Sequence, residues 1–106
     1  MGAEYFPTAE TIWANAALTP TQKLVAMCLL EHRNGDTWKC YPQHDRIMAR
    51  TGLGRAAVFE ALAKLRADGI IWWYKGDKRR SLANEYYFSV DHPKATVEEN
   101  RSAWWL

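Results

Sequence analysis

The chain has 106 residues, a length typical of one domain, and 48% of them are hydrophobic, which is enough to build a buried core. Its formal net charge is only +2, but nine basic and four acidic side chains fall within residues 43–80, so that stretch carries +5 and the rest −3. The sequence lacks both an apolar run of roughly 18 residues and an N-terminal signal peptide. We therefore expect a cytoplasmic protein of a bacterial host cell, without a membrane span and with its two cysteines reduced.

Residues 1–18 form an N-terminal arm that is expected to pack on the rest of the chain. Thr8 is a favourable N-cap for a short helix. Ile12 and Trp13 in that helix are predicted to pack inward. The arm contains no pattern that indicates chemistry.

The first long helix is predicted to begin after Thr19. Thr19 is a favourable N-cap, Pro20 suits the first helical position, and Gln22 completes a capping box. From Lys23 to about Arg33 the helix is apolar almost all round, which predicts burial on more than one side.

A turn and a short strand are expected next. The turn is Asn-Gly-Asp at residues 34–36. Trp38, Cys40 and Tyr41 then alternate as in a strand, and Pro42 ends it.

Residues 43–69 contain two short helices joined by a glycine-containing turn. The first helix stops at Thr51-Gly52, because glycine just past a helix readily takes the left-handed conformation. The second helix places apolar residues on one face with the spacing i, i+3, i+4, i+7, namely Val58, Ala61, Leu62 and Leu65. It closes at Asp68-Gly69, and the whole pattern is that of a helix-turn-helix.

Two strands are predicted after the second helix, over residues 70–75 and 84–90, with a basic loop between them at residues 76–81. Alternation along the first of these strands predicts that one of Trp72 and Trp73 is buried and the other exposed. Helix, strand, helix, turn, helix, strand, basic loop, strand is the order of a winged helix.

Three motifs resemble the winged helix-turn-helix family of phage and plasmid replication and regulatory proteins: Thr51-Gly52-Leu53-Gly54-Arg55, the series Val58, Leu62, Leu65 with Gly69-Ile70-Ile71, and the wing ending Asn84-x-Tyr86-x-Phe88. The resemblance extends over about residues 5–90. In that family Gly54 is usually Ser or Thr. The positions of Ala56, Ala57, Phe59 and Glu60 are usually richer in Arg, Thr, Gln or Asn. The chain is thus closer to the family in its scaffold than in its base-reading residues.

The expected fold class is α+β: a mainly helical winged helix-turn-helix with three core helices, an N-terminal helical arm, and a wing sheet of two or three strands. The expected divisions are the arm at 1–18, the winged helix-turn-helix domain at 19–90, and a polar tail at 91–106 that ends in a Trp-rich segment. Trp104 and Trp105 are predicted to pack across a homodimer or back onto the domain. A dimer would suit DNA with two half-sites.

Double-stranded DNA is the predicted partner, because the second helix of a helix-turn-helix enters the major groove and a basic stretch faces a polyanion. The resemblance implies transcription regulation or replication of a phage or plasmid. The candidate DNA contacts are Gln43 and Arg46 at phosphates, Arg55, Ala56 and Phe59 at base edges, Lys64 on the same helix, and Lys78, Arg79 and Arg80 on the wing. We expect affinity dominated by phosphates and modest sequence selectivity.

Other interpretations of the same residues remain open. The basic stretch also fits a solvated surface. A protein-interaction module that binds a host protein would use Phe59 and the neighbouring alanines, or the Trp-rich tail, as its contact surface. The aromatic runs at residues 72–74 and 104–105 also suit stacking on unpaired bases.

A metal site and an active site are not expected. Cys28-x-x-x-His32 and Cys40-x-x-x-His44 contain the ligand types that zinc prefers. However, closely paired cysteines are missing, and Cys40 and His44 belong to different predicted elements. Phosphate-binding loops, nucleophile elbows and paired carboxylates are also missing, so we predict neither a cofactor nor enzymatic activity.

Overall fold

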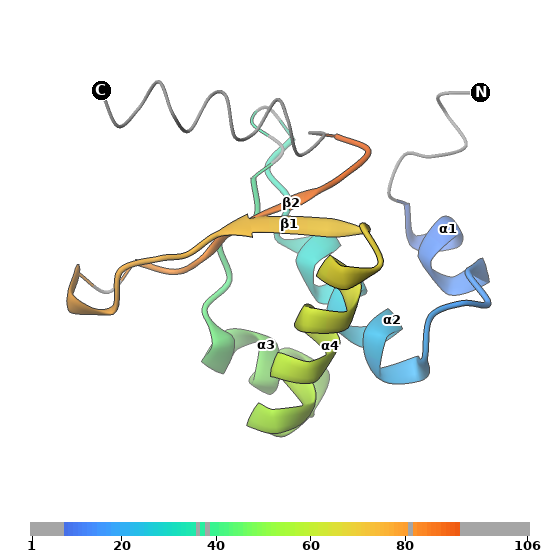
Figure 1. Cartoon of the computed structure of the whole chain (residues 1–106), viewed down its shortest axis with the longest axis horizontal. Helices are drawn as coiled ribbons and strands as arrows, with labels where there is room; N and C mark the ends of the chain where they lie inside the picture. The colour runs from blue at the N-terminus through green and yellow to red at the C-terminus, as the bar shows by residue number, and fades with distance from the viewer. Residues whose placement is uncertain (1–7, 36, 38, 81, 92–106) are drawn as a thin grey trace.

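The computed structural model describes residues 8–35, 37, 39–80 and 82–91. These residues form the elements α1 (Ala9–Ala14), α2 (Pro20–Glu31), α3 (His44–Thr51), α4 (Arg55–Ala67), β1 (Ile71–Tyr74), the 3-10 helix η2 (Lys78–Arg80) and β2 (Glu85–Phe88) (Figure 1). We call β1, β2 and the segment between them the wing. The predicted mainly helical α+β class is confirmed, and the arrangement is winged-helix-like.

Local capping sets where the first two helices begin, as predicted. The Thr8 hydroxyl oxygen accepts from the Thr11 N–H at 3.1 Å at the start of α1. At α2 the Thr19 hydroxyl accepts from the Gln22 N–H at 3.2 Å, and the Gln22 side chain accepts from the Thr19 N–H at 2.8 Å. These reciprocal bonds satisfy N–H groups that have no partner inside the helix.

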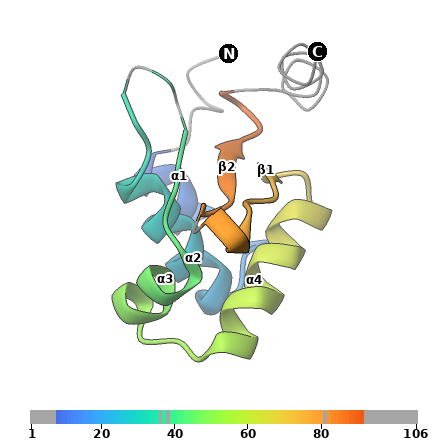
Figure 2. The ribbon, with the colours of Figure 1, turned by 90° about the vertical axis from the view of Figure 1, so that its left-hand side faces the viewer.

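Helix α2 packs against both α3 and α4 and supplies the centre of the core (Figure 2). The core is one cluster of buried apolar side chains from all these elements and the wing, among them Val25, Ala26, Leu29, Ile47, Val58, Leu62, Leu65, Ile71, Tyr86 and Phe88. Each buried Val, Leu, Ile or Phe side chain contributes roughly 1.5–3 kcal/mol through its burial. The two helices of the helix-turn-helix, α3 and α4, therefore both pack on α2.

The two strands form an antiparallel pair in which Ile71 lies opposite Phe88 and Trp73 opposite Tyr86. Tyr86 belongs to the core cluster, whereas its neighbour Tyr87 is buried outside that cluster. Successive residues of a strand point to opposite faces. The side chains of Tyr86 and Tyr87 therefore lie on opposite faces of the sheet.

The strand predicted around Cys40 is reduced to a single bridge in the part of the chain that the structure describes. The Cys40 N–H donates to the Tyr86 carbonyl at 3.0 Å, and the Tyr86 N–H donates to the Cys40 carbonyl at 2.8 Å. Trp38 lies outside the described residues. The sheet itself has two strands.

Two predictions about tryptophan burial are wrong. Ile12 is buried as expected, but Trp13 is 49% exposed. Trp72 and Trp73 are both half-buried instead of alternating. Arg66 of α4 explains the second difference, because its guanidinium carbon lies 5.3 Å from the Trp72 ring centre and 4.4 Å from the Trp73 ring centre.

No helix among the described residues is long and apolar enough to cross a membrane. Trp104 and Trp105 belong to residues 92–106, which lie outside the described part of the chain, so their role in a dimer stays a prediction.

Candidate nucleic-acid interface

The turn between α3 and α4 places the start of α4 at the surface. Gly52 ends α3 with a φ of 76°, and its N–H donates to the Met48 carbonyl at 2.9 Å. Gly54 then forms the N-cap of α4 and provides no side-chain cap. Arg55 and Ala56, the first two residues of α4, are exposed. A helix start with N–H groups left uncapped favours an anion such as a phosphate.

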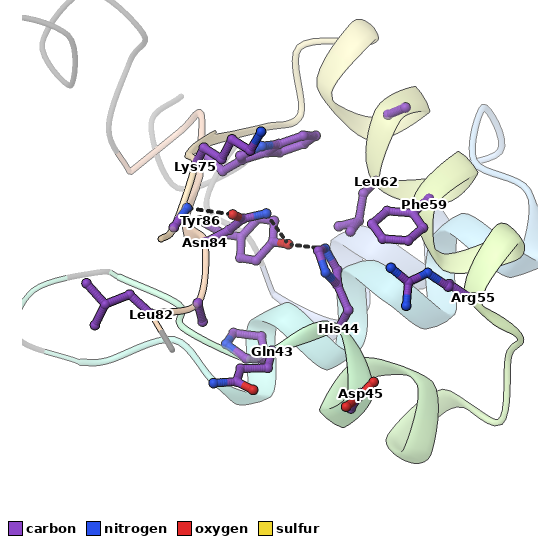
Figure 3. Close-up of a pocket in the computed structure, with 15 residues that line it drawn as sticks. Gln43, His44, Asp45, Arg55, Phe59, Leu62, Lys75, Leu82, Asn84 and Tyr86 are labelled. Atoms are coloured by element: carbon purple, nitrogen blue, oxygen red, sulfur yellow. Dashed lines mark hydrogen bonds between the residues drawn. The ribbon is translucent and has the colours of Figure 1, made fainter. Parts of the chain in front are cut away.

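The Phe59 ring contacts the His44 imidazole and the Arg55 guanidinium (Figure 3). Its ring centre is 4.4 Å from that of His44, with the planes tilted by 59°, and 5.1 Å from the Arg55 guanidinium carbon. Phe59 is 37% exposed. Arg55 of α4 and His44 of α3 therefore both contact the Phe59 ring.

A line of hydrogen bonds connects the wing to the start of α3 (Figure 3). The Gly76 N–H donates to Asn84 Oδ1 at 2.7 Å, and Asn84 Nδ2 donates to the Tyr86 phenol oxygen at 3.2 Å. His44 Nε2 lies 3.3 Å from the same phenol oxygen, within hydrogen-bond distance. Burial raises the pKa of Tyr86 above its usual value, so the phenol is protonated near neutral pH.

The base of the wing is so tight that only glycine fits at residue 76. A Cβ at this position would lie 2.1 Å from the Leu82 carbonyl oxygen and 2.5 Å from the Ala83 carbonyl carbon. Both neighbours are backbone atoms that cannot rotate away. The two sides of the wing therefore touch where the Gly76–Asn84 hydrogen bond forms.

A hollow of about 640 Å³ lies between the start of α3, the exposed side of α4 and the wing. Gln43, Arg55 and Phe59, which were predicted to contact DNA, line it together with His44 and Lys75. The remaining lining residues are Pro42, Asp45, Leu62, Ala63, Trp73, Gly76, Leu82, Ala83, Asn84 and Tyr86. The fold thus brings three of the predicted contacts to one concave surface.

Asp77 makes the hydrogen bonds that hold the described residues at the tip of the wing, where two arginines are exposed. The Asp77 side-chain Oδ1 accepts from the Arg79 N–H at 2.9 Å, and its carbonyl accepts from the N–H groups of Arg80 at 3.2 Å and Leu82 at 2.9 Å. Arg79 and Arg80 are exposed. Lys78 is the first residue of η2.

The other two predicted cations have partners within the protein. Arg46 Nε donates to His32 Nε2 at 3.4 Å, so its guanidinium lies against the end of α2. Lys64 Nζ is 3.6 Å from Asp68 Oδ1, one helical turn further along α4. Neither residue lines the hollow.

Sequence reasoning missed His44 and Lys75 as members of this site. His44 was considered only as a metal ligand, whereas its ring packs on Phe59 and faces Tyr86. The motif Asn84-x-Tyr86 was the available signal, because an amide and a phenol two residues apart on a strand share one face. Lys75 follows β1 directly, where the strand turns into the basic loop.

The cysteines and histidines of the described residues do not form one cluster. No group of three or more His, Cys, Asp or Glu side chains able to hold a metal ion occurs among the residues described. His32 Nδ1 lies 2.8 Å from the Cys28 carbonyl oxygen and 3.9 Å from its sulfur. Burial raises the pKa of the Cys40 thiol to about 12, so this thiol is protonated near neutral pH.

The fold and this face define a helix-turn-helix protein. Residues 16–71 match the family model described as a helix-turn-helix domain, and this stretch is more than half of the chain. The chain therefore belongs to that helix-turn-helix family, and this membership indicates DNA binding. No curated protein and no solved structure matches the chain.

Proposed function

We propose that this chain binds double-stranded DNA as a transcriptional regulator or replication accessory protein of a phage or plasmid, and that it acts by binding alone. We infer the DNA-binding face from one observation: Arg55 at the start of α4 and Lys75, directly after β1, line the same concave surface. Both are positive, and they come from the helix-turn-helix and the wing. The phage or plasmid setting rests on the motif resemblance at residues 51–71 and 84–88.

Base reading by this face is limited by its side chains. Arg55 is the only residue in the first turn of α4 with hydrogen-bond donors in its side chain, because Ala56, Ala57 and Val58 follow it. An arginine suits guanine, and an alanine suits the methyl group of thymine. Most of the binding free energy must then come from phosphate contacts at the start of α4 and at Arg79 and Arg80, which gives modest sequence selectivity.

Fluorescence anisotropy with a labelled random-sequence duplex at several salt concentrations tests this proposal. Replacing Lys78, Arg79 and Arg80 together by Ala should lower the slope of log affinity against log salt by up to about 2.7, since each lost phosphate contact removes about 0.9. The variant Arg79→Lys/Arg80→Lys keeps both charges and should retain the slope. Absence of binding by the unchanged protein at low salt would sink the DNA assignment.

A second candidate function is docking of a host protein on the same face. Phe59 is 37% exposed and Leu82 is 56% exposed, and both line the hollow. The variant Phe59→Lys separates the two functions, because it adds a positive charge and removes the aromatic anchor. Because most of the DNA affinity is assigned to phosphate contacts, DNA binding should weaken less in Phe59→Lys than in the triple wing variant, whereas docking of a protein should be lost.

A homodimer through Trp104 and Trp105 would bring two such faces to two half-sites on DNA. Sedimentation of the unchanged protein and of the variant Trp104→Ala/Trp105→Ala tests this part of the proposal. A mass that is the same for both proteins contradicts the dimer contact.

A further inference from the structure

The hollow has the size and walls of a small-molecule site. Its volume of about 640 Å³ lies within the range of roughly 300–1,000 Å³ that is usual for such sites. Its walls include the aromatic rings of Phe59, Trp73 and Tyr86 and the side chain of Leu62. Small-molecule sites are lined mainly by apolar and aromatic side chains of this kind.

Three polar side chains in the wall of the hollow, those of Asn84, Tyr86 and His44, lie in one line of hydrogen-bond contacts. Asn84 accepts from Gly76 and donates to Tyr86, and Tyr86 faces His44. These groups fix the shape of the walls, and their hydrogen bonds need no ligand. A ligand must therefore gain its affinity from the rings and from the charged residues at the edge.

The charged residues favour an anion. Arg55 and Lys75 both line the hollow, and neither forms an ion pair with another residue of the described chain. Asp45 is the one acidic side chain among the described lining residues. A negative group placed beside Arg55 would gain charge-assisted hydrogen bonds while its attached ring contacts Phe59.

We propose that this hollow binds a flat aromatic anion, that is, an aromatic carboxylate or phosphate. The ring lies among Phe59, Leu62 and Trp73, and the anionic group lies at Arg55 or Lys75. One consequence rests on the proposed function: because Gln43, Arg55 and Phe59 are also candidate DNA contacts, a bound ligand excludes DNA from the start of α4. The ligand then regulates DNA binding by competition at a shared surface.

The first experiment measures ligand binding to the full chain without DNA. The probes are 1-naphthoate, 1-naphthyl phosphate and neutral 1-naphthamide, with cyclohexanecarboxylate as an anion that lacks an aromatic ring. NMR titration should shift the Trp73 indole N–H and the amides around Phe59. At least one naphthyl anion should bind about tenfold more tightly than the amide, the size expected for one charge-assisted contact. The comparison of carboxylate with phosphate identifies which anionic group the site prefers.

Variants locate the site. Arg55→Gln or Lys75→Gln should remove the preference for the anion over 1-naphthamide. The exposed Lys64 lies on the same helix outside the hollow, so Lys64→Gln is the matched control and should leave that preference unchanged. Equal binding of anion and amide, shifts confined to residues away from the hollow, or no shifts up to the solubility limit of the probes would each overturn the proposal.

The second experiment adds the labelled duplex. The preferred naphthyl anion should displace it, and the amide at equal concentration should not. Ligand binding without displacement overturns the regulatory consequence and leaves the ligand site standing. Failure of DNA binding itself is seen before any ligand is added, so it contradicts the proposed function and not the ligand site.

Discussion

Gly52 and Gly54 lie two residues apart in the helix-turn-helix, but only the backbone conformation of Gly52 favours glycine. Gly52 has a φ of 76°, where a side chain causes strain, whereas Gly54 has a φ of −75° and an added Cβ would meet nothing within 4 Å. We predict that Gly54→Ser raises the free energy of unfolding by about 0.5–1 kcal/mol, since serine caps α4 and restricts the unfolded chain. Gly52→Ser should lower it by about 1 kcal/mol. Urea denaturation measures both, and equal effects of the two changes would contradict the argument.

The two cysteine thiols should be inert in the folded protein. Burial raises the pKa of Cys40 to about 12 and also raises the pKa of Cys28. We predict that a disulfide reagent at pH 8 labels neither thiol until denaturant is added, because the thiolate is the reactive form. Since the folded pKa of Cys40 exceeds the unfolded value of about 8.5, the associated stability is present below pH 8.5 and is lost as the pH rises toward 12. Rapid labelling without denaturant would be inconsistent with this burial.

At the scale of the elements, removing the hydroxyl group should have different effects on the two neighbouring tyrosines of β2. Tyr86 joins Asn84 to His44, whereas the Tyr87 hydroxyl donates to Glu85 of its own strand. We predict that Tyr86→Phe costs about 0.5–1.5 kcal/mol of stability, because the half-buried Asn84 and His44 side chains lose a hydrogen-bond partner. It should also speed hydrogen exchange at the Gly76 N–H and weaken DNA binding through a looser wing. The matched variant Tyr87→Phe should leave the Gly76 exchange rate and DNA affinity unchanged.

The contact of α4 with β1 depends on Arg66 above Trp72 and Trp73. We predict that Arg66→Ala lowers the free energy of unfolding by about 1–2 kcal/mol and shifts tryptophan emission to the red, because both rings become more exposed to water. Arg66→Lys should recover only part of this loss, since an ammonium cannot stack as a planar guanidinium does. Emission that does not change in Arg66→Ala would show that other groups cover the rings.

Interactions between residues close in the sequence were predictable, and those between distant residues were not. Thr8 and Thr19 cap helices through residues three positions away, so the sequence alone predicts their bonds. Trp13 and Trp73 depend on how α1 and α4 pack, which a strand or helix period does not specify. The hollow requires Gln43, Arg55 and Lys75 to meet from separate elements, so its existence follows only from the fold.

At the scale of the whole molecule, one ion pair joins the end of α2 to the segment after β2. Arg33 Nη1 lies 3.2 Å from Asp91 Oδ2, and the Asp91 side chain is fully buried. We predict that Arg33→Ala lowers the free energy of unfolding by about 2 kcal/mol or more, because a buried carboxylate loses its counter-charge. Arg50→Ala breaks a shorter pair, in which two Arg50 nitrogens donate to the Glu31 carboxylate at 2.8 Å, but both side chains are exposed, so this change should cost less. Urea denaturation of both variants tests this, and equal losses would contradict it.

The tight base of the wing also has a consequence for descent. Every amino-acid replacement of Gly76 adds at least a Cβ, and that atom has no room beside the backbone of Leu82 and Ala83. Exposed Arg79 and Arg80 at the tip meet no such limit. We therefore expect relatives that keep the wing to retain glycine at this position and to differ more at the tip.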